Sequence, residues 1–142
     1  MEIVVDTSAL RAMLAHAAVD TPREACGLLW CDPAHGRSTL STIDRAEPAA
    51  NVAAQPMTSF EIDPAALFGA QRRERAGGGC LAGWYHSHPS GVLDPSPSDA
   101  EAAGREPGRV WIIVGAARAA AWRSRPGGPV LGAFEALTLR IG

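Results

Sequence analysis

One short stretch of the chain concentrates side chains that bind metals. His86 and His88 stand two residues apart, and Asp99 follows eleven residues after His88. Residues two apart on a β-strand project from the same face, so both imidazoles can reach one ion at about 2.0 to 2.1 Å. A loop of this length can fold back and bring the aspartate to the same ion. Three protein ligands leave one position open for water, which is the composition of a catalytic zinc site.

Structural roles stay open for the same residues. The two histidines could instead be half-exposed residues at the end of a strand. The segment Ser96-Pro97-Ser98-Asp99 also has the form of a helix start, with a serine N-cap, a proline in the first turn and a carboxylate that complements the helix dipole. The two interpretations are compatible, because a helix that begins at Ser96 would hold Asp99 rigidly at a metal site.

Activation of a water at such a site needs a base that is not itself a ligand. Glu24 is the best candidate, since it directly precedes an apolar run at residues 25–31 that has the length of a buried strand. The segment Thr21-Pro22-Arg23-Glu24 also matches the S/T-x-x-E pattern of a helix capping box. The sequence therefore leaves a catalytic and a structural role for Glu24 equally open.

The remaining histidines and the cysteines indicate structure rather than chemistry. We expect His16 and His35 on the surface. Cys26 and Cys31 frame the apolar run as core residues or as a disulfide pair, and Cys80 precedes another apolar segment and is expected to be buried. Three cysteines are too few for a disulfide framework, and no partner histidine marks any of them as a nucleophile.

Short strands and helices must position these residues. We expect a first helix capped by Thr7 or Ser8, a second that starts at Asp63-Pro64, and a loop around residues 48–56. The expected helices cover residues 8–19, 64–76 and 98–104, and the expected strands cover residues 2–5, 25–31, 37–44, 57–62, 81–86, 109–115, 118–124 and 132–141. This mixed order predicts an α/β fold in which helices pack on a curved sheet.

Composition limits the class of protein. With 142 residues, of which 46% are hydrophobic and 20% charged, we expect a single domain over residues 1–142. The net charge of −2, from 13 basic and 15 acidic residues, argues against nucleic acid and against an anionic membrane as partners. No apolar stretch approaches the roughly 20 residues of a membrane span, and no signal-peptide pattern is present. We therefore expect a soluble, cytoplasmic protein, and the sequence leaves its oligomeric state open.

Three segments taken together resemble the JAMM motif of the JAB/MPN/Mov34 metalloproteases. In that motif a glutamate precedes His-x-His-Pro, and Ser-x-x-Asp follows after seven intervening residues. The segments are PREACGLL at residues 22–29, GWYHSHP at residues 83–89 and SPSD at residues 96–99. Residues 89–95 supply the seven intervening positions between His88 and Ser96. Asn51 and the segment at residues 59–64 extend the resemblance, which covers about residues 1–125.

The resemblance implies a fold and a role for each residue of the motif. The implied fold is a curved mixed β-sheet flanked by helices, the MPN/JAB or cytidine-deaminase-like sandwich. His86, His88 and Asp99 are implied to bind zinc, Glu24 to deprotonate the zinc-bound water and to pass a proton to the leaving amine, and Ser96 to help stabilise the oxyanion. Ser87 lies between the ligands and is expected to point to the opposite face of its strand, without a catalytic role.

The resemblance also implies a substrate class. The chain is similar to the small stand-alone prokaryotic members of the family. It would be a zinc-dependent metallopeptidase or isopeptidase that hydrolyses the amide bond after the C-terminal Gly-Gly of a ubiquitin-like or sulfur-carrier protein. One alternative is a non-catalytic MPN-type scaffold that binds a ubiquitin-like partner, although such relatives typically lack the metal ligands. A second is a non-haem iron oxygenase, which also uses two histidines and one carboxylate. The sequence does not identify the natural substrate or pathway.

Overall fold

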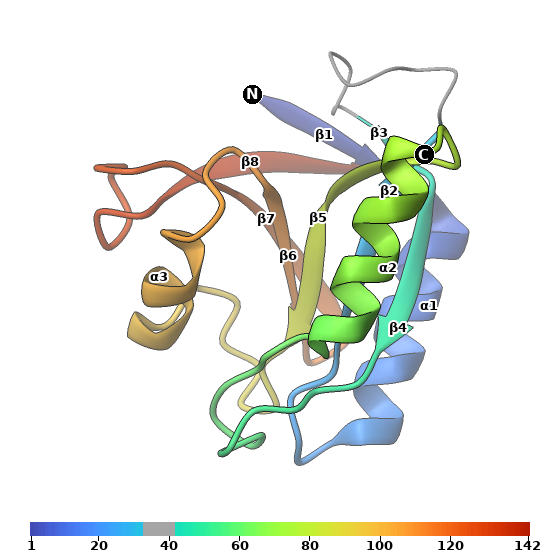
Figure 1. Ribbon diagram of the computed structural model, residues 1–142. Helices are drawn as coiled ribbons and strands as arrows, with labels where there is room; N and C mark the ends of the chain where they lie inside the picture. The colour runs from blue at the N-terminus through green and yellow to red at the C-terminus, as the bar shows by residue number, and fades with distance from the viewer. Residues whose placement is uncertain (33–41) are drawn as a thin grey trace.

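The computed structural model of the protein describes residues 1–32 and 42–142. The described residues form eight strands and three helices (Figure 1). In chain order, the elements are β1 (Glu2–Val5), α1 (Thr7–Asp20), β2 (Cys26–Cys31), β3 (Thr42–Ile43), β4 (Arg45–Ala49), α2 (Pro64–Arg75), β5 (Cys80–Ser87), α3 (Pro97–Ala103), β6 (Val110–Gly115), β7 (Arg118–Ser124) and β8 (Phe134–Ile141). None of the described helices has the length and apolar character needed to cross a lipid bilayer.

All eight strands belong to one mixed sheet in the order β3-β1-β8-β7-β6-β5-β2-β4. β1 runs parallel to both of its neighbours and β5 runs parallel to β6, whereas the other pairs are antiparallel. The two edge strands β3 and β4 are separated in the chain by Asp44 alone, whose backbone N–H donates to the carbonyl of Trp30 on β2 at 2.8 Å. The sheet is therefore strongly curved and nearly a barrel (Figure 1), and the curved mixed sheet that the resemblance implied is confirmed.

Helices cover both faces of this sheet. α1 contributes Ala9 and Met13 to a hydrophobic core on one face, where they pack with Tyr85 of β5. α2 and α3 cover the other face, whose core includes Trp84 of β5 and Trp111 of β6. Because side chains alternate along a strand, His86 projects from β5 on the same face as Trp84, toward α2 and α3.

The N-cap residues determine where α1 and α2 begin. Asp63 is its N-cap and accepts a hydrogen bond from the N–H of Ala65 at 3.1 Å, and Pro64 occupies the first turn, as the sequence predicts. α1 differs from the expectation. Its N-cap is Asp6, whose carboxylate accepts from the N–H of Ser8 at 2.8 Å, so the expectation that Thr7 or Ser8 caps the helix is wrong.

The segment between β3 and α2 differs most from the sequence prediction. Of the strand expected over residues 37–44, only Thr42–Ile43 is a strand, and residues 37–41 lie outside the described part of the chain. The strand expected over residues 57–62 is wrong, because only Ile62 pairs, in an isolated bridge with Asn51. The Asn51 side chain, rather than a neighbouring strand, accepts the N–H of Glu61 at 3.1 Å. β4 extends into the expected loop.

The cysteines and one histidine also correct the sequence analysis. Cys26, Cys31 and Cys80 are buried and form no disulfide with one another, so the disulfide alternative is wrong and the core assignment is confirmed. His16 is not simply a surface residue, because its Nδ1 lies 2.8 Å from the hydroxyl of Tyr85 and its side chain is only 15% exposed. His35 lies outside the described residues.

Candidate active site

Three segments bring Glu24, His86, His88 and Asp99 to one place. Glu24 lies just before β2, His86 is near the end of β5, His88 directly follows that strand, and Asp99 is in the first turn of α3. All four side chains are buried, and one candidate ligand atom from each lies within 4.8 Å of the others. These are the four residues that the sequence analysis singled out for metal binding and for the base.

The histidines and the aspartate surround a common position. The Nε2 atoms of His86 and His88 are 3.1 Å apart. Asp99 places Oδ1 3.1 Å from Nε2 of His86 and Oδ2 3.1 Å from Nε2 of His88. Ligands about 2.0 to 2.1 Å from a tetrahedral zinc are separated from one another by roughly 3.3 Å. The donor atoms are therefore spaced as a set of ligands to a single small cation.

Neighbouring groups fix the orientation of each imidazole. Nδ1 of His88 donates to the carbonyl oxygen of Val92 at 2.7 Å, which turns Nε2 toward His86 and Asp99. His86 is held by rings instead. Phe60 stacks on it with centroids 4.2 Å apart, and Trp111 meets it edge-on at 5.7 Å. Its Nδ1 is buried without a hydrogen-bond partner among the described residues.

Two residues of the cluster, Asp99 and His86, have the ionisation states that cation binding requires. Burial alone would raise the pKa of Asp99, but hydrogen bonds from His86 and His88 hold it well below its ordinary value. Burial lowers the pKa of His86 despite the nearby carboxylate. Burial also opposes the charged form of His88, but its contacts with Asp99 and Val92 outweigh this effect and raise its pKa. Asp99 is thus an anion and His86 a neutral imidazole, as metal ligands must be.

The surroundings of Glu24 exclude the capping interpretation. Residues 21–25 do not begin a helix, so the capping-box interpretation is wrong. The side chain is 5% exposed, and its Oε1 has no hydrogen-bond partner among the described residues. Burial raises the pKa of Glu24 to about 7; the charge of Asp99 also raises it, whereas His88 lowers it. A carboxylate with this pKa can both accept and return a proton near neutral pH.

Ser96 forms the expected helix start at the site. It is the N-cap of α3, with its Oγ accepting from the N–H of Asp99 at 3.1 Å. In return the N–H of Ser96 donates to Oδ2 of Asp99 at 2.9 Å, which completes a capping box. The cap therefore holds the carboxylate that faces the histidines, and the hydroxyl proton of Ser96 remains available to another acceptor.

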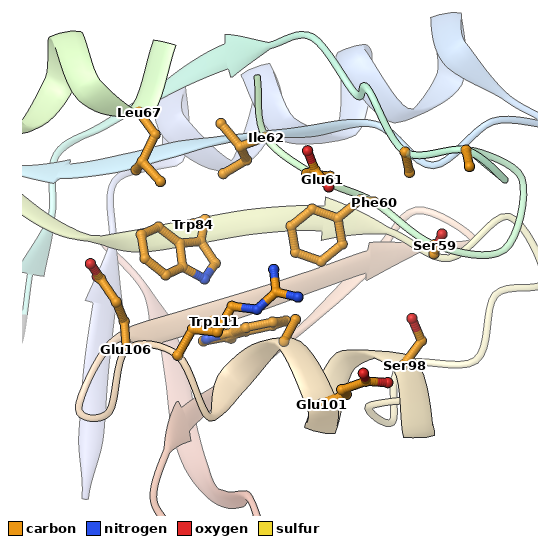
Figure 2. Close-up of a pocket in the computed structure, with 14 residues that line it drawn as sticks. Ser59, Phe60, Glu61, Ile62, Leu67, Trp84, Ser98, Glu101, Glu106 and Trp111 are labelled. Atoms are coloured by element: carbon orange, nitrogen blue, oxygen red, sulfur yellow. The ribbon is translucent and has the colours of Figure 1, made fainter. Parts of the chain in front are cut away.

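A cleft of about 510 Å³ lies beside the cluster on the face covered by α2 and α3. Figure 2 shows it between the segment at residues 59–62 and α3. Phe60 and Trp111 line the cleft and also contact the His86 ring, so the cleft borders the candidate metal site. Ser98 and Glu101 of α3 line it from the other side. Phe60 and Trp111 form the aromatic wall of the cleft, and this wall together with the polar rim is typical of a ligand site.

The sequence analysis missed the role of the aromatic wall. Phe60 was assigned to a strand, but it lies in an irregular segment and covers His86. An aromatic residue shortly before the Asp63 N-cap is the one available signal, and it does not identify a partner 26 positions further along the chain. Ser87, in contrast, lies as expected on the opposite face of β5 from His86, where its Oγ accepts from the N–H of Ala25 at 2.8 Å.

Comparisons with known proteins agree with this geometry. A family model described as prokaryotic homologs of the JAB domain matches residues 6–125. The chain is 37% identical over 106 residues to a desampylase of Haloferax volcanii, which covers 72% of this chain and 72% of that protein. It is 35% identical over 97 residues to a probable TtuB-protein conjugate cleaving protease of Thermus thermophilus, covering 68% of this chain and 60% of that protein. The solution structure of a protein from Desulfitobacterium hafniense is similar with a TM-score of 0.79 and 25% identity, covering 99% of this chain and 92% of that one.

Proposed function

The chain belongs to the family of prokaryotic JAB domains, and we propose that it is a zinc-dependent hydrolase that cleaves the amide bond after the C-terminal Gly-Gly of a ubiquitin-like or sulfur-carrier protein. The observation that carries this proposal is the convergence of His86, His88 and Asp99 on one position beside the buried, unpartnered carboxylate of Glu24. A scaffold that only binds its partner needs none of these four residues, so their joint presence favours catalysis.

The donor set matches zinc in number, type and spacing. His86 and His88 would bind through Nε2 and Asp99 through its carboxylate, leaving room for a water and for the carbonyl oxygen of a substrate. When bound, zinc supplies Lewis acidity that polarises the carbonyl and lowers the pKa of the water to about 7. The buried Glu24 carboxylate lies within 4.8 Å of these ligand atoms, where it can act on that water.

Glu24 moves the proton in the proposed reaction. Its carboxylate takes a proton from the attacking water as the oxygen bonds to the carbonyl carbon, and then delivers it to the nitrogen as the carbon–nitrogen bond breaks. Its pKa of about 7 suits both steps. The hydroxyl of Ser96, fixed by the capping box, donates to the oxyanion that develops on the carbonyl oxygen.

The cleft and the relatives support the substrate class. The names of the two relatives, a desampylase and a TtuB-protein conjugate cleaving protease, describe the removal of small proteins from conjugates. Phe60 and Trp111 stand against the His86 ring, so the wall of the cleft lies directly beside the reacting position. An extended Gly-Gly segment has no side chains to collide with such a wall. We therefore propose that the tail enters this cleft with the second glycine at the metal site.

Mass spectrometry of two substrates tests the proposal. One is a Gly-Gly sulfur carrier with a short C-terminal extension, and the other is the same carrier joined through its C-terminal glycine to a lysine side chain. We expect loss of everything beyond the second glycine, abolished by a zinc chelator, restored by zinc and absent in Glu24→Gln. If both substrates remain intact with protein that holds about one zinc per chain, the Gly-Gly specificity is wrong.

A further inference from the structure

Hydrogen bonds hold the backbone N–H and carbonyl groups of both Glu24 and the next residue, Ala25. The N–H of Glu24 donates to the carbonyl of Pro56 at 2.7 Å, and its own carbonyl accepts from the side chain of Asn51 at 2.9 Å. The N–H of Ala25 donates to Oγ of Ser87 at 2.8 Å, and the carbonyl of Ala25 accepts from the N–H of Ser87 at 2.9 Å. The backbone of residues 24–25 is therefore clamped between β5 and the segment that follows β4.

The side chain of Glu24 has no comparable anchor. Its Oε1 is buried and has no hydrogen-bond partner among the described residues. The backbone of Glu24 must therefore determine where the carboxylate lies relative to the metal ligands. Misplacement of a reacting group by about 1 Å can cost about 100-fold in rate. Residues that hold this backbone thus act on the reaction without touching the substrate.

Asn51 joins the base to the wall of the cleft. Its amide group donates to the carbonyls of Glu24 at 2.9 Å and Ser59 at 3.1 Å. Its side-chain oxygen accepts from the N–H of Ala53 at 3.0 Å and of Glu61 at 3.1 Å. Ser59 and Glu61 flank Phe60, which stacks on His86. One side chain therefore sets the spacing between the base and the aromatic wall.

Ser87 holds the base from the other side. It lies between the two histidines in the chain, is 3% exposed, and lines a cavity with His88 and with residues of α1. Its hydroxyl accepts the Ala25 N–H, so the strand that presents His86 also fixes the residue next to Glu24. The same end of β5 therefore carries the ligand His86 and, through Ser87, holds the backbone beside Glu24.

We propose that Asn51 and Ser87 are positioning residues that fix the carboxylate of Glu24 relative to the metal ligands, with Asn51 also fixing the wall that carries Phe60. This inference rests on the proposed role of Glu24 as the base. Neither side chain contacts a ligand atom of His86, His88 or Asp99 in any described interaction, so the two residues act on the base and not on metal binding.

Two pairs of variants separate positioning from general support. Ser87→Ala removes the acceptor of the Ala25 N–H, whereas Ser87→Thr keeps the hydroxyl and adds a methyl group beside a cavity of about 280 Å³. The matched control is Ser124→Ala, because Ser124 is also a buried strand serine whose Oγ accepts a backbone N–H, from Arg109 at 3.1 Å, but on β7. Asn51→Asp keeps the acceptor for Ala53 and Glu61 and loses the donor to Glu24.

Each variant has a distinct expected result. In Ser87→Ala we expect kcat to fall about 10- to 100-fold with KM and zinc affinity unchanged, and recovery in Ser87→Thr. In Asn51→Asp we expect the same fall in kcat together with a raised KM, because the wall of the cleft moves too. Ser124→Ala leaves kcat unchanged. In a Glu24→Gln background, Ser87→Ala should lower kcat no further, since it acts through the base.

Amide hydrogen exchange tests the clamp without any substrate. With zinc bound, the Ala25 amide should exchange faster in Ser87→Ala than in the wild type and be protected again in Ser87→Thr. Unchanged exchange at Ala25 overturns the proposal, even if no carrier protein is cleaved. Full kcat despite faster exchange, or a loss of zinc affinity equal to the loss of kcat, also overturns it. If the wild type cleaves neither carrier but the exchange result holds, the proposed function fails and the clamp stands.

Discussion

The Nδ1 atom of His88 donates to the carbonyl oxygen of Val92 at 2.7 Å, so the loop after β5 folds back onto the imidazole ring of His88. The turn is closed by a second hydrogen bond, from the N–H of Gly91 to the carbonyl of His88 at 2.9 Å. Gly91 adopts a φ of +84°, a conformation that strongly favours glycine. The orientation of a candidate metal ligand therefore depends on a backbone turn.

Gly91→Ala should weaken zinc binding. A Cβ at this position would meet the Cβ of Ala116 at 3.2 Å, and the positive φ adds strain, so the Val92 carbonyl should shift from His88. We expect a loss of about 10-fold in zinc affinity, the lower end for residues that orient metal ligands. Chelator competition measures it. Gly77→Ala is the control, because Gly77 has a φ of +81° with nothing near its Cβ position; equal zinc affinities in both variants would refute the prediction.

Asp99→Asn should abolish zinc binding and activity. The amide carries no charge and can present only one oxygen, whereas the carboxylate faces both histidines at 3.1 Å. We expect hydrolysis at the uncatalysed background and less than about a tenth of the zinc content by elemental analysis, since one of three ligands is lost. Asp94→Asn is the matched control, because Asp94 is exposed on the loop that leads into α3. A zinc-loaded Asp99→Asn protein would remove this residue from the ligand set.

Glu24→Gln should separate chemistry from metal binding. The amide cannot accept the proton of the attacking water, so kcat should fall about 10²- to 10⁴-fold. Zinc content should remain that of the wild type, because Glu24 is not assigned as a ligand. Steady-state kinetics and elemental analysis on the same preparation measure both quantities. Full activity in this variant would require another base.

Ser96→Ala should affect both stability and rate. Loss of the N-cap of α3 is expected to cost about 1 kcal/mol in the free energy of unfolding. Loss of the hydroxyl donor is expected to lower kcat a further 10²- to 10³-fold, roughly the value of one oxyanion donor. Asp63→Ala removes the N-cap of α2 at a similar cost of about 1 kcal/mol and provides the comparison. Equal activity in the two variants would limit Ser96 to capping.

Removal of zinc should lower the melting temperature. Zinc that binds only the folded chain stabilises it by about 2.7 kcal/mol at a free concentration 100 times Kd. The cluster joins segments from before β2, from β5 and from α3, so its ligands come together only in the folded state. Thermal unfolding with and without chelator measures the effect, and Asp99→Asn should show no difference between the two conditions. A chelator-independent melting temperature in the wild type would argue against this site.

The sequence predicted which residues gather at the candidate site better than it predicted their surroundings. The spacing of His86, His88 and Asp99 reflects local rules, namely strand alternation and a capped helix start, and the structure brings these residues together. The role of Glu24 stayed ambiguous because a capping box and an extended residue before a strand share the same short pattern. Only the structure, in which residues 21–25 begin no helix, separates them.

Contacts between distant segments could not be predicted. Hydrophobic periodicity describes single elements, so it does not predict the contact of His16 with Tyr85, 69 residues away. For the same reason it does not predict the stacking of Phe60 on His86. The expected strand over residues 57–62 failed because alternation of apolar residues does not show whether a partner strand exists. There the side chain of Asn51 binds the backbone instead. β4 was missed because it contains Pro48, a residue tolerated mainly in edge strands.

The curled sheet also bears on how the protein behaves at high concentration. An exposed strand edge is a template on which other chains can add and aggregate. Here one edge strand, β3, has two residues in the part of the chain that the structure describes, and the other, β4, carries a proline that removes one backbone donor. Asp44 lies between β3 and β4 in the chain, and its backbone N–H donates a hydrogen bond to the carbonyl of Trp30 on β2. Among the described residues, the two edges of the sheet thus leave incoming strands little backbone on which to grow.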